Sequence, residues 1–465
     1  MFKPLEILYE KSPCLLQDIG ITLYGIKIYR REYGRRLERL LAQFESQQWF
    51  SRPELENYQN EKLHSIMKHC YENVPYYQSL MRARKLTPAD IRSAADLTKL
   101  PILTRDDVRQ HQKAMIATNV RRSALIAGHT SGTTGSPLEV FYDRSVCLAK
   151  NAADWRQKLI AGINLGDRIA YFLGRLVVPV RNSKPPFWRH NWTLNHLFCS
   201  SFHLSPNNLK TYVDKLRSFS PKAIEGYPST VYIMAASLLS NNQTLPVQAV
   251  FTSSEPLLEH HREVIQKAFE APVFDYYGMA ERTVFATECE RHSGKHVNTD
   301  FGIVEILGEK GKPAAKGELG RLVTTGLHNF AMPLLRYQTS DVSLWSQNEC
   351  PCGRSFPLMN DVTTKDEDIV TSPDGRYISS SILTHPFKPM HTIEESQIIQ
   401  ESLHEVRILV VRRESYTDKD SLYLIEEFKK RLGEDVEVTV EFVDSIPRAS
   451  AGKYKWVISK VPLRF

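Results

Sequence analysis

Residues 130–137 read Thr130-Ser131-Gly132-Thr133-Thr134-Gly135-Ser136-Pro137, and this stretch decides the prediction of the fold. It consists of hydroxyl residues, glycine and a closing proline, without a charged side chain. Such a composition favours turns over helices and buried strands, because Ser and Thr side chains hydrogen-bond to nearby backbone. Its amide and hydroxyl donors suit a loop that wraps an anionic group, as in glycine-rich phosphate loops. A polar surface turn is the competing interpretation.

The composition is that of an ordinary globular protein. The 465 residues, 42% hydrophobic and 24% charged, suggest two or three domains, one of them large. The net charge of +7 helps to attract anionic ligands such as nucleotides, but without long Lys/Arg runs we expect no nucleic-acid partner. No apolar stretch predicts a membrane span or a signal peptide, and seven scattered cysteines indicate a reducing compartment. We therefore expect a cytoplasmic protein without integral membrane association.

Residues 1–50 are expected to be mostly helical, with arginines spread along 28–44. We interpret these arginines as a solvated basic face on a helix that packs onto the main body. A peripheral membrane contact is the weaker alternative.

From about 125 to 345, short apolar runs alternate with helical patterns, which is typical of an α/β domain. The expected strands are 138–142, 168–173, 222–227, 249–253 and 273–277, and the expected helices are 206–219, 230–239 and 257–269. Near the end we expect a smaller α/β unit with helices 394–403 and 422–432 and strands 406–411 and 436–442. Ligands of open α/β sheets bind beyond the carboxyl ends of the strands.

Polar residues follow two of these strands in a way that suits a nucleotide. Ser254 and Glu255 come directly after 249–253, and 276–281 reads Tyr276-Tyr277-Gly278-Met279-Ala280-Glu281. An aromatic ring stacks on a base, glycine allows close backbone approach, and a carboxylate holds Mg²⁺. A strand-ending turn with a solvated carboxylate is the alternative.

Two further residues complete the set. Asp341 ends the stretch Arg336-Tyr337-Gln338-Thr339-Ser340-Asp341, where its carboxylate is placed to accept both hydroxyls of a ribose. Lys453 ends 446–453, IPRASAGK, in a loop that can carry a compact positive charge to a phosphorus centre. Taken singly, the first would be an ordinary cap and the second a surface lysine.

In this order, the four motifs resemble those of the adenylate-forming superfamily over essentially the full length. More narrowly, the chain resembles the phenylacetate–coenzyme A ligase family, in its capsule-biosynthesis and coenzyme-F synthetase-like branch. Weaker signs of that branch are VPYY at 74–77, LPILT at 100–104, GYPS at 226–229 and CPCGR at 350–354. The resemblance implies an α/β fold: an N-terminal domain of stacked sheets and helices over 1–363, with a helical extension over about 1–60. A mobile C-terminal α/β domain over 366–465 would follow a hinge near 364–366.

The resemblance also implies the role of each residue toward ATP. Thr130, Ser131, Thr133 and Thr134 would hold the β and γ phosphates in a loop that includes Gly132 and Gly135. Glu281 would bind Mg²⁺, and Lys453 would stabilise charge at the α phosphate; with Thr133, these form the catalytic set. Ser254, Glu255, Tyr276, Tyr277, Gly278 and Met279 would frame adenine, and Asp341 would bind the ribose.

Three positions depart from the usual pattern of the family. Leu138 stands where most members have lysine, and Ser340 replaces the usual glycine. Lys365, which we still assign to nucleotide binding, replaces arginine and keeps the charge without its bidentate contacts. Because of these three departures we expect less than the full catalytic activity of the family, but not an inactive enzyme.

The implied function is an AMP-forming ligase that activates a carboxylic acid, aryl or arylacetic acids included. The acyl group would pass from its adenylate to a thiol such as coenzyme A. One alternative is transfer to an amine or sugar amine, or transfer of AMP itself, in polysaccharide or secondary-metabolite biosynthesis. Another is a non-catalytic nucleotide-binding scaffold. The particular acid, the acceptor and the oligomeric state are not predicted.

A second group of residues has the composition of a zinc site. Cys289, His292 and His296 lie close together, and Cys350 and Cys352 form a CxC pair further on. Structural zinc takes four N or S ligands, and we expect Cys289, His296, Cys350 and Cys352 to supply them. The resemblance favours His296 as the histidine ligand, and His292 is the alternative. Ordinary free cysteines in a turn are the alternative.

Overall fold

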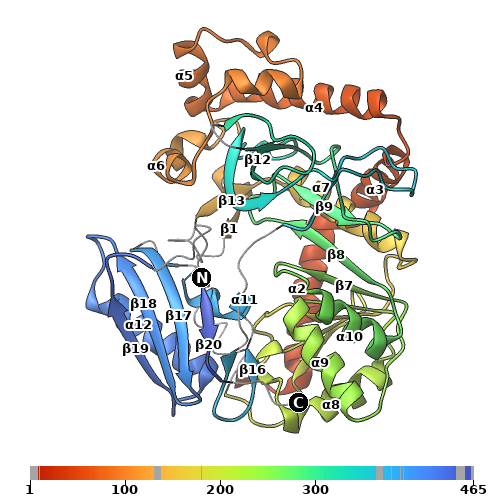
Figure 1. Ribbon diagram of the computed structural model, residues 1–465, viewed down its shortest axis with the longest axis vertical. Coiled ribbons are helices and arrows are strands. Elements are labelled where there is room, and N and C mark those ends of the chain that lie inside the picture. The colour runs from red at the N-terminus through yellow and green to blue at the C-terminus, as the bar shows by residue number, and fades with distance from the viewer. Residues whose placement is uncertain are drawn as a thin grey trace.

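A computed structural model describes residues 9, 11–129, 138–179, 181–308, 311–362, 370–378, 380–387, 389–390, 392–446 and 456–461. Its centre is a nine-stranded sheet in the order β14-β10-β9-β8-β7-β6-β3-β5-β4 (Figure 1). The strands are β3 (Ile169–Phe172), β4 (Trp188–Asn191), β5 (His196–Cys199), β6 (Ala223–Gly226), β7 (Ala249–Ser253), β8 (Val273–Gly278), β9 (Phe285–Glu288), β10 (Lys295–Val297) and β14 (Leu358–Met359). Five central strands, β5, β3, β6, β7 and β8, run parallel, so their carboxyl ends lie at one edge.

Helices cover both faces of this sheet. One face packs against α7 (Arg144–Ile160), whose Ala149 and Trp155 share a buried cluster with Phe251 and Phe274. The other face packs against α8 (Pro206–Phe219), α9 (Pro228–Ser240) and α10 (Glu259–Phe269) (Figure 1). Burial on both faces explains the continuous apolar runs of the central strands.

Two smaller sheets adjoin the upper end of the large one. The first is a hairpin of β1 (Ile126–His129) and β2 (Glu139–Tyr142), and the second contains β11 (Gly302–Leu307), β12 (Gly320–Gly326) and β13 (Tyr337–Ser343). The helices α4 (Arg52–Asn73) and α5 (Pro75–Ala83) lie above β12 and β13, and α6 (Arg105–Met115) lies to their left (Figure 1). Near the chain start, α2 (Cys14–Glu32) lies along β4, and α3 (Arg35–Gln47) packs on α7.

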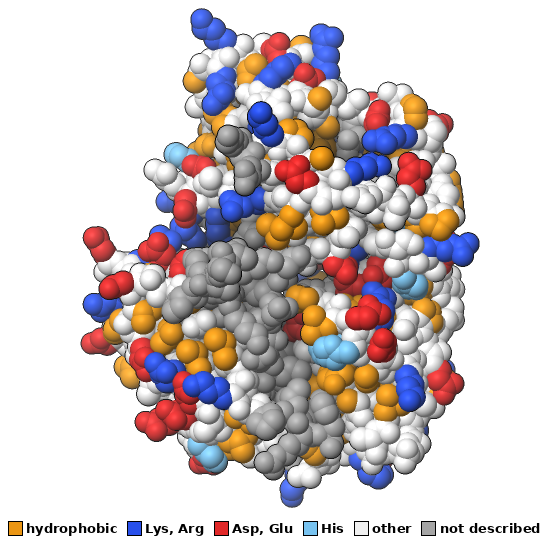
Figure 2. Space-filling view, viewed as in Figure 1, with side chains coloured by type: hydrophobic (Ala, Val, Ile, Leu, Met, Phe, Trp, Pro, Cys, Tyr) orange, Lys and Arg blue, Asp and Glu red, His pale blue; other side chains and the backbone are white. Residues whose placement is uncertain are grey.

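The C-terminal part has its own sheet, in the order β19-β18-β17-β20. Its elements are β17 (Ile393–Ser402), β18 (Glu405–Arg412), α12 (Asp418–Leu432), β19 (Glu437–Phe442) and β20 (Val457–Ser459), preceded by β15 (Val370–Thr371), β16 (Tyr377–Ile378) and the short α11 (Ser380–Leu383). Their shared core also contains Phe202, which lies in the short turn after β5. On the face drawn in Figure 2, hydrophobic side chains are scattered among acidic and basic ones.

The structure confirms most of the predicted elements but corrects one. The predicted helix 394–403 is wrong, because this segment is the strand β17, paired with β18 on one side and β20 on the other. Its isoleucines at 393, 398 and 399 are β-branched, and the buried sides of the paired strands decide its conformation. Among the described residues, no helix is long and apolar enough to cross a bilayer.

Two buried ion pairs hold α7 in place. The Arg156 guanidinium lies 2.5 and 3.1 Å from the carboxylate oxygens of Asp300, and both side chains are at most 3% exposed. Lys158 contacts Asp154, which lies one turn earlier in α7. The Lys158 ammonium also lies 3.0 Å from a carboxylate oxygen of Glu225 in β6. Burial alone would lower the pKa of Lys158, but the two carboxylates raise it above its usual value. Together the pairs attach α7 to β6 and to the segment that precedes β11.

We expect Arg156→Met to lower the free energy of unfolding by about 3–5 kcal/mol, because Asp300 would be left buried without its partner. Equilibrium unfolding in urea measures this difference. The matched control is Lys210→Met, which breaks an ion pair whose side chains are 85% and 55% exposed and should cost less than about 1 kcal/mol. Equal effects of the two substitutions would contradict the importance of the buried pair.

Candidate active site and metal centre

A hydrogen bond joins the large sheet to the three-stranded sheet at the predicted site. The hydroxyl of Tyr277, from β8, donates to Oδ2 of Asp341, from β13, at 2.6 Å. Burial, followed by the neighbouring charge of Asp341, raises the pKa of Tyr277 well above its usual value, so it stays a donor. The hydrogen bond fixes the carboxylate predicted to bind ribose beside the strand predicted to frame adenine.

Glu281 lies near this junction and is also held by a tyrosine. Tyr337, the first residue of β13, donates its hydroxyl to Oε1 of Glu281 at 2.9 Å. Glu281 is only 6% exposed, and burial raises its pKa, against the opposing influences of Arg105 and of the Tyr337 hydrogen bond. A divalent cation would stabilise the ionised form of such a buried carboxylate, so Glu281 is chemically suited to be a Mg²⁺ ligand.

The β1–β2 hairpin abuts the Glu281 segment. The hydroxyl of Tyr142, in β2, hydrogen-bonds to the carbonyl of Ala280, and the Arg282 guanidinium lies 4.2 Å from the centre of the Tyr142 ring. His129 pairs with Glu139 in the hairpin, so the chain enters and leaves 130–137 at neighbouring positions. The predicted phosphate-loop residues themselves lie outside the described residues. Both flanks of that segment nevertheless belong to a hairpin packed next to Glu281.

The remaining nucleotide candidates occupy the ends of β7 and β8. Ser254 follows β7 with a positive φ of 71°, and Glu255 accepts a hydrogen bond at 3.1 Å from the backbone N–H of Ser229, in the first turn of α9. Gly278 ends β8, where an added Cβ would lie 3.2 Å from the ring of Phe285. Met279 follows, and its sulfur accepts a hydrogen bond from Thr283 at 3.3 Å. Lys365 and Lys453 lie outside the described residues, so their roles stay predictions.

A buried polar network beneath the strand ends was missed by the sequence analysis. The hydroxyl of Tyr276 donates to Glu225 at 3.2 Å, and Glu225 in turn pairs with Lys158 and through it with Asp154. The one signal in the sequence is a carboxylate in the otherwise apolar strand that ends at Gly226. The network connects a predicted adenine-framing residue to α7.

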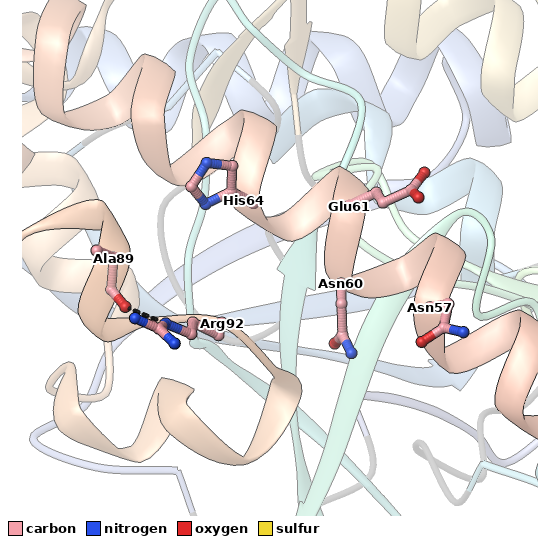
Figure 3. Close-up of a pocket in the computed structure, with 6 residues that line it drawn as sticks. All are labelled: Asn57, Asn60, Glu61, His64, Ala89 and Arg92. Carbon is pink, nitrogen blue, oxygen red and sulfur yellow. Dashed lines mark hydrogen bonds between the residues drawn. The ribbon is translucent and has the colours of Figure 1, made fainter.

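An open hollow of about 620 Å³ lies elsewhere, between α4 and the 3₁₀ turn Pro88–Asp90 (Figure 3). Its lining residues are Asn57, Asn60, Glu61, His64, Ala89 and Arg92. The Arg92 guanidinium donates to the Ala89 carbonyl at 2.8 Å. None of the predicted site residues lines this hollow.

The structure brings together the four predicted zinc ligands at the end of the large sheet. The Sγ atoms of the three cysteines and a ring nitrogen of His296 all lie within 4.8 Å of one another. The Sγ atoms of Cys289 and Cys350 are 3.5 Å apart, and Sγ of Cys352 is 3.4 Å from Nε2 of His296. Tetrahedral zinc with its usual bond lengths would place such ligand pairs about 3.6–3.8 Å apart. The donor set and its spacing fit a closed zinc site.

Surrounding contacts orient these ligands and separate the two histidines. Nδ1 of His296 lies 3.3 Å from the carbonyl of Phe356, which leaves Nε2 directed at the thiols, as is usual for metal-bound histidine. Nδ1 of His292 instead lies 3.0 Å from Glu288. The CxC turn contains Gly353 at a positive φ of 84°, and Arg354 stacks 4.6 Å from the Trp49 ring.

The C-terminal residues 370–460 match the CapK C-terminal domain. Protein CapK of Staphylococcus aureus is 28% identical over 473 residues, which cover 98% of this chain and 100% of CapK. The phenylacetate–coenzyme A ligase of Thermus thermophilus is 25% identical over 344 residues, covering 69% of this chain and 72% of that protein. The chain is a homologue of protein CapK and of the phenylacetate–coenzyme A ligases.

Among solved structures, the chain resembles 2-hydroxyisobutyryl-CoA ligase in complex with 2-HIB-AMP and CoA. The TM-score is 0.59 at 22% identity, over 88% of this chain and 91% of the ligase. The same ligase in its postadenylation state gives a TM-score of 0.56. These similarities confirm the predicted resemblance and the α/β adenylate-forming fold.

If the Cys/His cluster binds zinc, the purified protein should contain about one zinc ion per chain. We expect Cys352→Ser and His296→Ala to lose the metal and to melt at a lower temperature, because a closed site stabilises the fold. Elemental analysis and thermal unfolding measure both effects. His292→Ala and Cys14→Ser are the controls and should keep the metal. Loss of zinc in His292→Ala together with retention of zinc in His296→Ala would show that His292 is the ligand and that the assignment of His296 is wrong.

Proposed function

We propose that this chain is an AMP-forming acid ligase, which activates a carboxylic acid as its acyl adenylate and transfers the acyl group to a thiol such as coenzyme A. The observation that most directly supports this function is a pair of carboxylates, Asp341 and Glu281. Each accepts a hydrogen bond from a tyrosine where β8 meets β13. MgATP has two groups that a carboxylate can bind, the ribose hydroxyls and the Mg²⁺ ion. The two carboxylates at this sheet junction could bind one group each.

The described residues perform the positioning that this chemistry needs. Tyr277 holds Asp341 in a fixed orientation toward the ribose, and Tyr337 does the same for Glu281. When bound at Glu281, Mg²⁺ would neutralise phosphate charge. The phosphates would then lie toward the β1–β2 hairpin, and the Ser, Thr and Gly residues that the sequence places between its two strands would supply amide and hydroxyl donors. Reactions of this kind depend on alignment and charge stabilisation more than on a general base.

The relatives support the acid-ligase assignment through their names. Curated relatives from Thermus thermophilus and Escherichia coli are phenylacetate–coenzyme A ligases, and the solved neighbour holds an acyl-AMP and CoA. We propose that this chain likewise uses ATP and Mg²⁺. We propose a structural zinc ion at the Cys/His cluster, and its three thiols need the reducing conditions of a cytoplasm.

The second candidate function keeps adenylation and changes the acceptor. The similarity to CapK covers both chains almost entirely, whereas the similarity to the Thermus ligase covers 69% of this chain. Because CapK is not named as a coenzyme A ligase, transfer to an amine or sugar amine in place of coenzyme A is kept as the second candidate. The release of pyrophosphate is common to both, and dependence on coenzyme A distinguishes them. A scaffold without catalysis would release no pyrophosphate.

The first test is acid-dependent exchange of labelled pyrophosphate into ATP, measured across a panel of carboxylic acids. We expect exchange with one acid class and a loss of about 10²–10³-fold in Lys453→Ala, because one stabilising charge at the reacting phosphorus is removed. Lys460→Ala is the matched control, since Lys460 is exposed and pairs with Glu401. Absence of ATP binding to the unmodified protein would refute the proposal.

The second test addresses the tyrosine that holds Asp341. Tyr277→Phe removes one hydrogen bond worth about 0.5–1.5 kcal/mol, so we expect KM for ATP to rise up to about tenfold. Asp341→Ala should raise KM further, and steady-state kinetics with the acid from the exchange assay measures both. Tyr58→Phe is the control, because Tyr58 lies on α4 and hydrogen-bonds to Gln43. An unchanged KM in Asp341→Ala would remove Asp341 from the ribose site.

A further inference from the structure

The helix α2 is held on the protein largely by polar contacts. The Arg189 side chain, from β4, donates to Oε1 of Gln17 at 2.6 Å, and the backbone N–H of His190 donates to Asp18 at 3.0 Å. The buried residues of α2 are Gln17 and Gly25, and Gly25 lies tightly against Asn191. A surface helix of a globular protein normally buries an apolar stripe, whereas Ile21 and Ile28 on the inward side of α2 are only half-buried.

The outward side of α2 is correspondingly apolar in its first half. Leu15, Leu16, Leu23 and Tyr24 are 54–62% exposed, and Ile19 is 38% exposed. At 3.6 residues per turn, Leu15, Leu16, Ile19 and Leu23 fall on one side of the helix. We call these four residues and Tyr24 the outer face of α2. Trp192, which is 47% exposed, donates its backbone N–H to Thr22 and lies beside the same helix.

The second half of the same side is basic. Lys27 and Arg30 are exposed there, and Arg35, Arg36 and Arg39 follow on α3. The two acidic residues of α2 in the described chain are engaged elsewhere. Asp18 accepts the hydrogen bond from His190, and Glu32 pairs with Arg31 and accepts from Asn151. The exposed side of α2 therefore combines leucines with cations and presents no exposed acidic side chain.

We propose that the outer face of α2 binds the surface of an anionic lipid bilayer. Leucines that enter the boundary between head groups and acyl chains, together with cations at the head groups, are the combination by which a helix lies on a membrane. A second copy of this chain fits less well, because the same side of another α2 offers no exposed acidic side chain to pair with Lys27 and Arg30. This inference goes beyond the proposed ligase function and does not depend on it.

Vesicle flotation of the full-length protein tests the proposal. We expect the protein to float with phosphatidylcholine vesicles that contain phosphatidylglycerol, and at least tenfold less with phosphatidylcholine alone. Leu16→Ser with Leu23→Ser should reduce the bound fraction at least tenfold. Lys27→Gln with Arg30→Gln should reduce binding to the anionic vesicles about tenfold and weaken its dependence on salt.

The matched control is Leu319→Ser with Leu422→Ser, which replaces two leucines that are 55% and 65% exposed elsewhere. This variant should bind as the unmodified protein does, and thermal unfolding should show that every variant is folded. Binding that is equal with the outer-face leucines present or replaced would overturn the proposal. It would also be overturned by the absence of vesicle binding together with a dimer, in sedimentation velocity, that Leu16→Ser with Leu23→Ser dissociates.

Discussion

The structure depends on charges that are buried beneath α7. Arg156 with Asp300, and Lys158 with Asp154 and Glu225, replace what would ordinarily be an apolar contact between a helix and a sheet. Taking charges out of water is costly, so such pairs persist only where their geometry is well satisfied. They position α7 against β6, and through Tyr276 they extend to the carboxyl ends of the strands. The buried ion pairs in the layer below therefore help to position the residues of the proposed nucleotide site.

Where local chemistry decides the structure, the sequence was sufficient. The helix α8 has its predicted bounds, 206–219, because Pro206 suits the first turn of a helix. The strands β7 and β8 follow their predicted ranges because apolar runs there stop at polar residues. In β17 local chemistry was misleading. Glu394, Glu395 and Gln397 resemble the polar side of a helix, and only pairing with β18 and β20 settles the conformation.

The candidate site divides in the same way. Its residue types could be predicted from motifs, and so could the Cys/His cluster, because three cysteines and a histidine with short spacings are rare outside metal sites. The tyrosine that serves each carboxylate could not be predicted. Tyr277 and Asp341 are 64 positions apart and Tyr337 and Glu281 are 56 apart, and no local pattern encodes such pairs. Lys158 also escaped prediction, because a charged residue in a helix ordinarily faces water.

The polar contacts between α2 and β4 have a consequence for the tendency of the protein to aggregate. As the last strand of the nine-stranded order, β4 has one side on which the described residues place no further strand. Such an edge is a template on which another chain can add a strand. Side chains of α2 occupy it instead, because Asp18 accepts from the N–H of His190 and Thr22 donates to the His190 carbonyl at 3.4 Å. The helix thus ends the sheet and protects it from edge-to-edge aggregation, at the expense of leaving leucines on its other side.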